Sequence, residues 1–248
     1  MIKRLFVSDV HLGSKLCKPK VVRNFKKLIE KFVNYDEVYL LGDIFDFWVK
    51  EPEILLKEYK DIVESLNEAS ASTKLYYIVG NHDFLAFDYA DYFNFDLAFE
   101  KTFQVYSEKY DKWYKALVIH DFKCDPLYRR FKLLWKFYLM FGDKFWGANR
   151  ILQLFWEVIA KIIDFMTYRY SYETIRTKGT KKDIEEFRKA VYLKAKKERV
   201  QFLIHGHTHK SAITTYKDVI IVDCGTFLKG EYFEMDDTKF IYKKWQKV

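Results

Sequence analysis

The sequence predicts an α/β fold, and two observations support this class. In the first third of the chain, short apolar runs rich in strand-forming residues alternate with segments whose apolar residues follow helical spacing. The chain has 248 residues, of which 50% are hydrophobic, so it can bury one large core. Strands joined by helices form a sheet with helical crossovers. We therefore expect a single domain over residues 1–248 that carries one insertion.

The expected elements of the first third follow in a regular order. They are a strand at 2–8, a helix at 20–33, a strand ending at Gly42, a helix at about 54–67, a polar loop at 69–73 and a strand ending at Gly80. The crossover helices lie between strands, which favours parallel strand pairing.

From about residue 100 the pattern changes. Two segments at 102–107 and 113–119 resemble a hairpin, and a helical block crowded with Phe, Trp, Tyr, Leu and Ile occupies about 125–172, within an expected insertion at 125–178. The remaining expected elements are a charged helix at 181–199, a strand ending at His205 and short strands at 213–216, 219–222 and 240–245. A helix that is apolar around most of its circumference must be covered by protein, lipid or an apolar ligand.

Five predicted strands end in residue types that bind metals. The strand-end motifs are Asp9-Val10-His11, Gly42-Asp43-Ile44-Phe45-Asp46, Gly80-Asn81-His82-Asp83, His120 and His205-Gly206-His207-Thr208-His209. All six histidines of the chain lie in these motifs. Residues two apart in an extended strand point to the same face, so we expect the first Asp and His to reach one ion. This concentration of histidines predicts a metal site.

The donors are nitrogen and oxygen atoms without thiolates, which suits Mn²⁺, Fe or Zn²⁺ at a catalytic site and not a structural zinc. Asp43 is the candidate for a carboxylate that bridges two divalent ions. Two ions about 3.5–4 Å apart can clamp an in-line phosphoryl displacement and activate water.

Charge and cysteine usage restrict the partners and the compartment. The net charge of +8 and the pI of about 9.1 favour anionic partners, namely a phosphorylated metabolite, an anionic membrane surface or nucleic acid. The three cysteines are far apart and form no C-x-x-C pair, which favours a reducing compartment. We find no signal peptide and no uncharged run of 18 residues, so we expect a cytoplasmic protein that can sit on a membrane.

The ordered motifs resemble those of the calcineurin-like metallophosphoesterases, a family with a four-layer αββα sandwich. By this resemblance, one ion would be held by Asp9, His11, Asp43 and His209, and the other by Asp43, Asn81, His120 and His207. His82 would stabilise the transition state or protonate the leaving oxygen, and the bridging Asp43 would share the catalytic work. The resemblance also implies that Asp46 and Asp83 orient ligands and backbone, and that His205 orients a ligand or contacts the substrate.

Within that family the sequence is most similar to the UDP-2,3-diacylglucosamine diphosphatases of lipid A synthesis. Their helical insertion (lid) binds acyl chains, and Asp125 and Tyr128 match the D-x-x-Y with which it begins. Basic residues of the block, among them Arg129 and Lys132, are candidates for neutralising substrate phosphates. The resemblance implies two Mn²⁺ ions, a nucleotide-linked lipid substrate and a place on the inner face of the cytoplasmic membrane.

Two other functions remain open from the residues. A phosphodiesterase or nuclease acting on nucleic acid, or on another phosphorylated lipid, fits the positive charge and the aromatic residues. A non-catalytic scaffold is the third hypothesis, and the complete ligand set argues against it. Binding of nucleic acid falls steeply with salt, whereas an acyl-chain site responds to detergent. These responses distinguish the nuclease from the hydrolase of a lipid-linked nucleotide.

Overall fold

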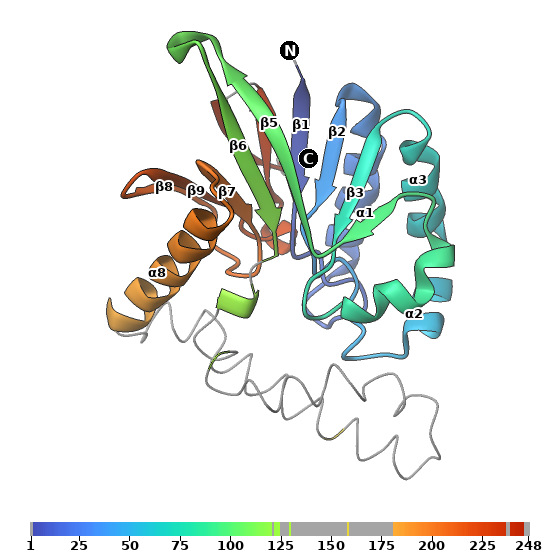
Figure 1. The fold of residues 1–248 in the computed structure, drawn as a ribbon. Helices are drawn as coiled ribbons and strands as arrows, with labels where there is room; N and C mark the ends of the chain where they lie inside the picture. The colour runs from blue at the N-terminus through green and yellow to red at the C-terminus, as the bar shows by residue number, and fades with distance from the viewer. Residues whose placement is uncertain are drawn as a thin grey trace.

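The computed structural model describes residues 2–120, 122–124, 181–236 and 239–245, together with Arg129 and Val158. Two β-sheets form the centre of this part of the chain (Figure 1). The first sheet has the strand order β11-β10-β1-β2-β3-β4, and its central pairs β1–β2 and β2–β3 are parallel. The bounds of its strands are Lys3–Val7 (β1), Glu37–Leu40 (β2), Lys74–Ile78 (β3), Asp96–Ala98 (β4), Glu231–Asp236 (β10) and Lys239–Lys244 (β11).

The second sheet has the order β5-β6-β7-β9-β8. Strands β5 and β6 form the expected antiparallel hairpin, whereas β6, β7 and β9 are parallel. Its strands are Glu100–Ser107 (β5), Lys112–Ile119 (β6), Phe202–His205 (β7), Ala212–Tyr216 (β8) and Val219–Asp223 (β9).

Helices cover the outer face of each sheet (Figure 1). The α-helices are Pro19–Ile29 (α1), Pro52–Glu58 (α2), Lys60–Ser70 (α3) and Lys181–Lys197 (α8). Short 3-10 helices complete the described elements, at Phe32–Asn34 (η1), Phe84–Tyr92 (η2), Glu108–Tyr110 (η3), Phe122–Cys124 (η4) and Phe227–Lys229 (η5).

Alternation along the strands produces four layers. In β1, Leu5 and Val7 belong to the core cluster under α1 and α3, whereas Phe6 faces the second sheet. In the second sheet, Val118 contributes to the core between the sheets, and Leu117 packs towards α8. This arrangement confirms the expected four-layer αββα sandwich.

Some elements differ from the sequence expectation. The helix expected at 54–67 is two helices, because Tyr59 has φ −105° and ψ 31° and interrupts the helical path between α2 and α3. The first helix ends at Ile29, before the expected residue 33, and α3 extends to Ser70 into the expected loop. Strands β4 and β10 escaped prediction because β4 has three residues and β10 contains three acidic residues among its six.

The register places the strand ends together. Val7 of β1 pairs with Leu40 of β2, and Leu40 pairs with Tyr77 of β3, so the loops that follow these strands start at one edge. In the second sheet, Ile119 pairs with His205 at the ends of β6 and β7. The predicted insertion at 125–178 lies outside the described residues, apart from Arg129 and Val158. Among the described residues, no helix has the length and hydropathy needed to cross a membrane.

Candidate metal centre

Loops at the carboxyl ends of five strands bring the predicted ligands together. Each of three groups has its potential ligand atoms within 4.8 Å of one another: Asp9, His11 and His209; Asp43, His120 and His207; and His11, Asp43 and His82. The first two groups lie on the two sides expected for a pair of ions, and Asp43 connects the second and third. All these residues are buried or half-buried.

Asp43 lies at the centre of this arrangement. Its Oδ2 atom is 3.2 Å from Nε2 of His120, 3.9 Å from Nε2 of His11 and 4.0 Å from Nε2 of His82. Its Oδ1 atom accepts a hydrogen bond of 2.9 Å from the backbone N–H of His82. One carboxylate therefore faces imidazoles from three different loops, which is the position that a bridging ligand needs.

The backbone at the site differs from the expectation. Asp9 and His11 follow β1 and are not part of an extended strand, and their φ values are 57° and 53°. The expected same-face geometry of a strand is therefore wrong for this pair. Asp43, His207 and His209 also have positive φ, at 53°, 71° and 55°. The left-handed region costs a non-glycine residue about 1–3 kcal/mol, and such residues persist only where the surroundings hold them.

Hydrogen bonds between loops supply that support. The loops after β1 and β2 are joined by Asp9 N to Gly42 O at 3.1 Å and His11 N to Asp43 O at 2.9 Å. Asp9 Oδ2 accepts from the backbone N–H of His207 at 3.0 Å and from the hydroxyl of Ser8. Each ligand loop is thus fixed by a neighbouring one, so the left-handed residues are stabilised as a set.

Unsatisfied buried atoms show that the donor set suits a cation. Among the described residues, Oδ1 of Asp9, Oδ1 of Asn81 and Nε2 of His120 are buried and make no hydrogen bond. Nδ1 of His120 donates to the carbonyl oxygen of Leu41 at 2.6 Å, which turns Nε2 towards Asp43. Buried polar atoms without hydrogen bonds are rare and costly, and divalent cations in the two expected positions would satisfy these three.

Electrostatics keeps the carboxylates charged. Burial raises the pKa of Asp43, but the charges of His120 and His82 outweigh burial and hold this pKa well below its ordinary range. Burial also raises the pKa of Asp9, but the neighbouring His209 and His11 outweigh burial and hold this pKa well below its ordinary value. Both side chains are anionic at neutral pH, as metal ligands must be.

The family follows from comparison with known proteins. The model of the calcineurin-like phosphoesterase family matches residues 2–211, which include every strand-end motif. The chain belongs to this family. It is therefore a metal-dependent phosphohydrolase.

Curated relatives of this phosphoesterase carry one shared name. UDP-2,3-diacylglucosamine hydrolase of Haemophilus ducreyi is 28% identical over 229 residues, covering 86% of each chain. The protein of the same name from Haemophilus influenzae strain PittGG is 25% identical, and the match covers 94% of each chain. The one from Chromohalobacter salexigens is 28% identical, and the match covers 84% of this chain and 80% of the relative. Among solved structures, vacuolar protein sorting 29 of Cryptosporidium parvum covers 98% of this chain and 95% of its own at 12% identity and a TM-score of 0.47.

Asp83 and Asp46 of the phosphoesterase lie beside the ligand loops. Asp83 accepts hydrogen bonds of 2.7 Å from the backbone N–H groups of Ile44 and Gly80, and one of 2.5 Å from the hydroxyl of Tyr77. It thereby joins the loops that carry Asp43 and Asn81. Burial and the charge of Asp43 raise the pKa of Asp83 to about 6.

His82 is held on three sides. Its Nδ1 atom is 3.0 Å from Oδ1 of Asp46, and its ring stacks on Trp48 with centroids 4.1 Å apart and an interplanar angle of 20°. His11 meets the same ring edge-on at 4.8 Å. The indole of Trp48 also donates to the carbonyl oxygen of Asn81 at 2.8 Å. These contacts leave Nε2 of His82 directed towards Asp43.

The structure adds two residues to which sequence reasoning assigned no role. These residues are Trp48, described above, and Asp223. Asp223 at the end of β9 accepts a hydrogen bond from the hydroxyl of Thr208, the residue between His207 and His209. The signal for Asp223 was present, because Val219–Asp223 is another apolar strand that ends in a carboxylate. His205 pairs with Asp223 in the sheet and is buried, with Nδ1 2.9 Å from the carbonyl oxygen of Gly206.

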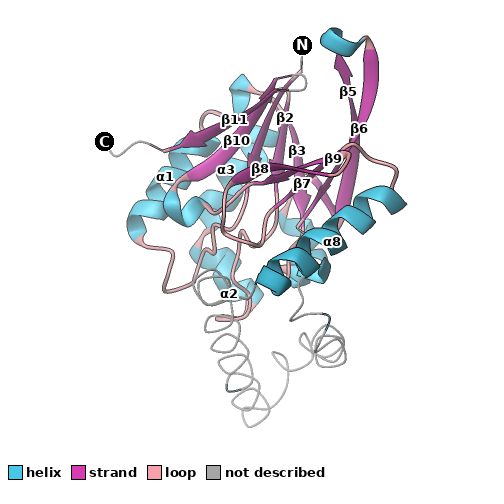
Figure 2. Cartoon of the chain, turned by 90° about the vertical axis from the view of Figure 1, so that its left-hand side faces the viewer, coloured by secondary structure: helices cyan, strands magenta, loops and turns pink. Residues whose placement is uncertain are grey.

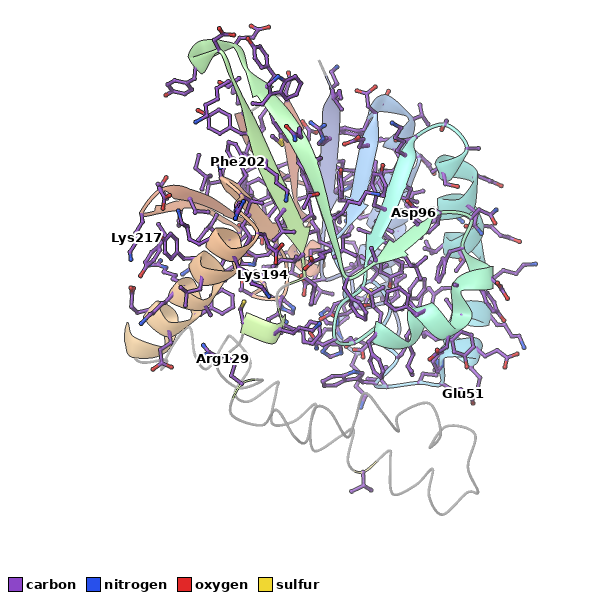
Figure 3. All side chains as sticks on the ribbon, viewed as in Figure 1. Glu51, Asp96, Arg129, Lys194, Phe202 and Lys217 are labelled. Carbon is purple, nitrogen blue, oxygen red and sulfur yellow. The ribbon has the colours of Figure 1, made fainter. Side chains whose placement is uncertain are left out.

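The predicted substrate contacts fall almost entirely outside the described residues. Asp125, Tyr128 and Lys132 are not described, and Arg129 is exposed (Figure 3).

Gly80→Ala should weaken metal binding. A methyl group at residue 80 would lie 2.3 Å from Oδ1 of Asp43 and 2.8 Å from its backbone nitrogen, so the carboxylate must move. We expect metal affinity to fall by at least about 10–100-fold, the range for disturbed support of a ligand. Titration of metal into the metal-free protein measures this affinity.

Gly230→Ala is the matched control. Its φ of +76° makes alanine strained, and its nearest contact is Trp245, away from the metal ligands. We expect lower thermal stability with unchanged metal affinity. Equal metal affinities for the Gly80 variant and the unaltered protein would contradict the steric argument.

Proposed function

We propose that this phosphohydrolase cleaves the diphosphate of UDP-2,3-diacylglucosamine, releasing UMP and the lipid monophosphate. The observation that carries the proposal is the name shared by relatives whose matches cover 80% or more of both chains. The paired histidine and aspartate groups support it, because hydrolysis of a diphosphate places several negative charges beside the attacked phosphorus.

The residues fit two divalent ions in the following way. One ion would bind Asp9, His11, Asp43 and His209, and the other would bind Asp43, Asn81, His120 and His207. We propose Mn²⁺ because nitrogen and oxygen donors are mixed and thiolates are lacking from the group. When bound, two such ions would neutralise phosphate charge and lower the pKa of water to near neutrality.

His82 would supply the proton. Asp46 holds Nδ1 at 3.0 Å, which stabilises the protonated ring and leaves the Nε2–H directed into the site. Water adds its hydroxyl to the attacked phosphorus, and the bond from that phosphorus to the bridging oxygen breaks. The leaving phosphate oxygen takes the proton from Nε2 of His82, and the proton released by the water restores the imidazolium. Asp46 and Trp48 keep the ring in place throughout.

We further propose that the enzyme works at the inner face of the cytoplasmic membrane. A substrate with two acyl chains resides in a bilayer, and the net charge of +8 favours an anionic lipid surface. The apolar residues at 125–178 are the proposed acyl-chain site, as the sequence indicates.

The test compares substrates. With Mn²⁺ present, we expect rapid UMP release from UDP-2,3-diacylglucosamine in mixed micelles, dependence on detergent, and slow hydrolysis of bis-p-nitrophenyl phosphate. Enzyme stripped with a chelator is the control. Hydrolysis of the generic diester without UMP release would overturn the substrate and leave the phosphoesterase chemistry intact. Salt-sensitive cleavage of an oligonucleotide would favour a nuclease instead.

A further inference from the structure

A basic groove lies between α1 and β11. These two elements lie on the same side of the molecule (Figure 2). Its volume is about 560 Å³, and none of the described residues that line it is acidic. Six cationic residues line it: Lys20, Arg23, Lys27, Lys31, Lys243 and Lys244. None of the lining residues belongs to the metal centre.

The helix contributes a continuous stripe. Lys20, Arg23 and Lys27 of α1 are spaced three and four residues apart, so they lie on one face of the helix, and Lys31 follows two residues after the helix ends. Phe25, Leu28 and Ile29 are buried on the other side of α1. The first turn of α1 holds no acidic residue and the helix contains none at all, although the positive end of the helix dipole favours acids there. The dipole favours Lys27 in the last turn, but it does not account for Lys20 and Arg23 near the start of the helix.

The edge strand faces this stripe with further positive charge. Lysines on an edge strand protect it from pairing with other chains, and this explains Lys243 and Lys244 taken alone. It does not explain why a basic helix face converges on the same groove. Within the described chain, only Lys243 of the six has an acidic partner, Glu234 at 3.3 Å. Like charges that converge on a concave surface attract an anion.

The floor of the groove is ordered by contacts of Trp245. Its backbone N–H donates to the carbonyl oxygen of Gly230 at 2.8 Å, and its ring lies 6.5 Å from that of Phe227. The ammonium of Lys31 is 4.5 Å above the indole ring. The aromatic ring thus positions one of the cations, so the groove has a defined shape.

We propose that the groove between α1 and β11 is a binding site for a phosphate-bearing anion, separate from the metal centre. Phosphate matches the set because Arg23 offers a planar fork for two oxygens and the lysines surround it with point charges. Phospholipid head groups and soluble polyphosphates share this chemistry. The groove binds the anion without chemical change.

Lys27→Gln with Lys244→Gln tests the site, because it removes one charge from each wall. The probes are tripolyphosphate, measured by calorimetry, and vesicles of phosphatidylcholine with and without phosphatidylglycerol, measured by sedimentation. At about 1 kcal/mol per charge near an anionic surface, the double variant should bind about 25-fold more weakly. Binding to the unaltered protein should also weaken as salt rises.

The matched control is Lys26→Gln with Lys239→Gln, which removes the same charge from the same helix and strand outside the groove. It should keep the binding of the unaltered protein. If the test variant loses binding to vesicles alone, phospholipid head groups are the ligand. If it loses binding to tripolyphosphate alone, the ligand is a soluble anion, and loss of binding to both probes shows that the groove accepts either. Equal binding by the two double variants would overturn the site. Hydrolysis of bis-p-nitrophenyl phosphate should be unchanged in both, so failure here is distinct from failure of the proposed substrate.

Discussion

Replacement of Asp43 by alanine should release both metal ions and reduce phosphohydrolase activity below detection. The physical reason is the position of its carboxylate, whose Oδ2 lies 3.2–4.0 Å from nitrogens of His120, His11 and His82. Removing it takes a ligand from each proposed ion and leaves imidazoles facing one another without the anion between them. The backbone N–H of His82 also loses its acceptor. Among the described residues, Asp43 is the one side chain proposed as a ligand to both ions.

Metal content of the purified variant, measured by elemental analysis, checks this expectation beside activity. Asp61→Ala is the control, because Asp61 is an exposed aspartate whose partner is Lys26 on the protein surface. Asp43→Asn separates shape from charge, since the amide keeps an oxygen for the His82 N–H but carries no negative charge. Full metal occupancy in Asp43→Ala would exclude the bridging position, and loss of a single ion would assign Asp43 to one side alone.

His82→Ala should keep both ions and lower kcat by roughly 10²–10⁴-fold, the contribution typical of a general acid. Nδ1 is committed to Asp46 and the ring is stacked on Trp48, so the available atom is Nε2. A proton delivered there matters most when the leaving oxygen is basic. We therefore expect a large defect with a diphosphate or alkyl phosphoester and a much smaller one with p-nitrophenyl esters.

His11→Ala is the matched comparison for this prediction. His11 also approaches Asp46 and Asp43, at 3.7 and 3.9 Å, but it is placed as a ligand and its removal should cost one ion. The group of His11, Asp43 and His82 is compact enough to hold a cation itself. Loss of metal from His82→Ala would make His82 a ligand, and an equal defect on all leaving groups would remove its role as proton donor.

Local sequence patterns predicted much of the fold and most of the candidate metal ligands. Short apolar runs rich in strand-forming residues predicted β1, β2, β3, β5, β6, β7, β8 and β9 close to their observed bounds. Strands such as β1, β2 and β7 bury nearly every residue, so their apolar residues are consecutive in the sequence. Apolar runs that end in aspartate or histidine located the candidate ligands, since the carboxyl ends of these strands, from both sheets, meet at the centre. Strand β10 was missed because its apolar Tyr232, Phe233 and Met235 are interrupted by acidic residues and form no continuous apolar run.

The amino-acid sequence by itself determined the chemistry of the centre: which donor atoms are present, their mixture of nitrogen and oxygen, and their order along the chain. Tertiary structure alone decided how the donors are aimed. The left-handed backbone at Asp9, His11 and Asp43 depends on hydrogen bonds between loops more than 30 residues apart, and so local periodicity could not indicate it. The same holds for the stacking of Trp48 on His82 and for the basic groove, whose walls come from opposite ends of the chain. Residue types are local information, whereas these contacts exist only once distant segments have packed together.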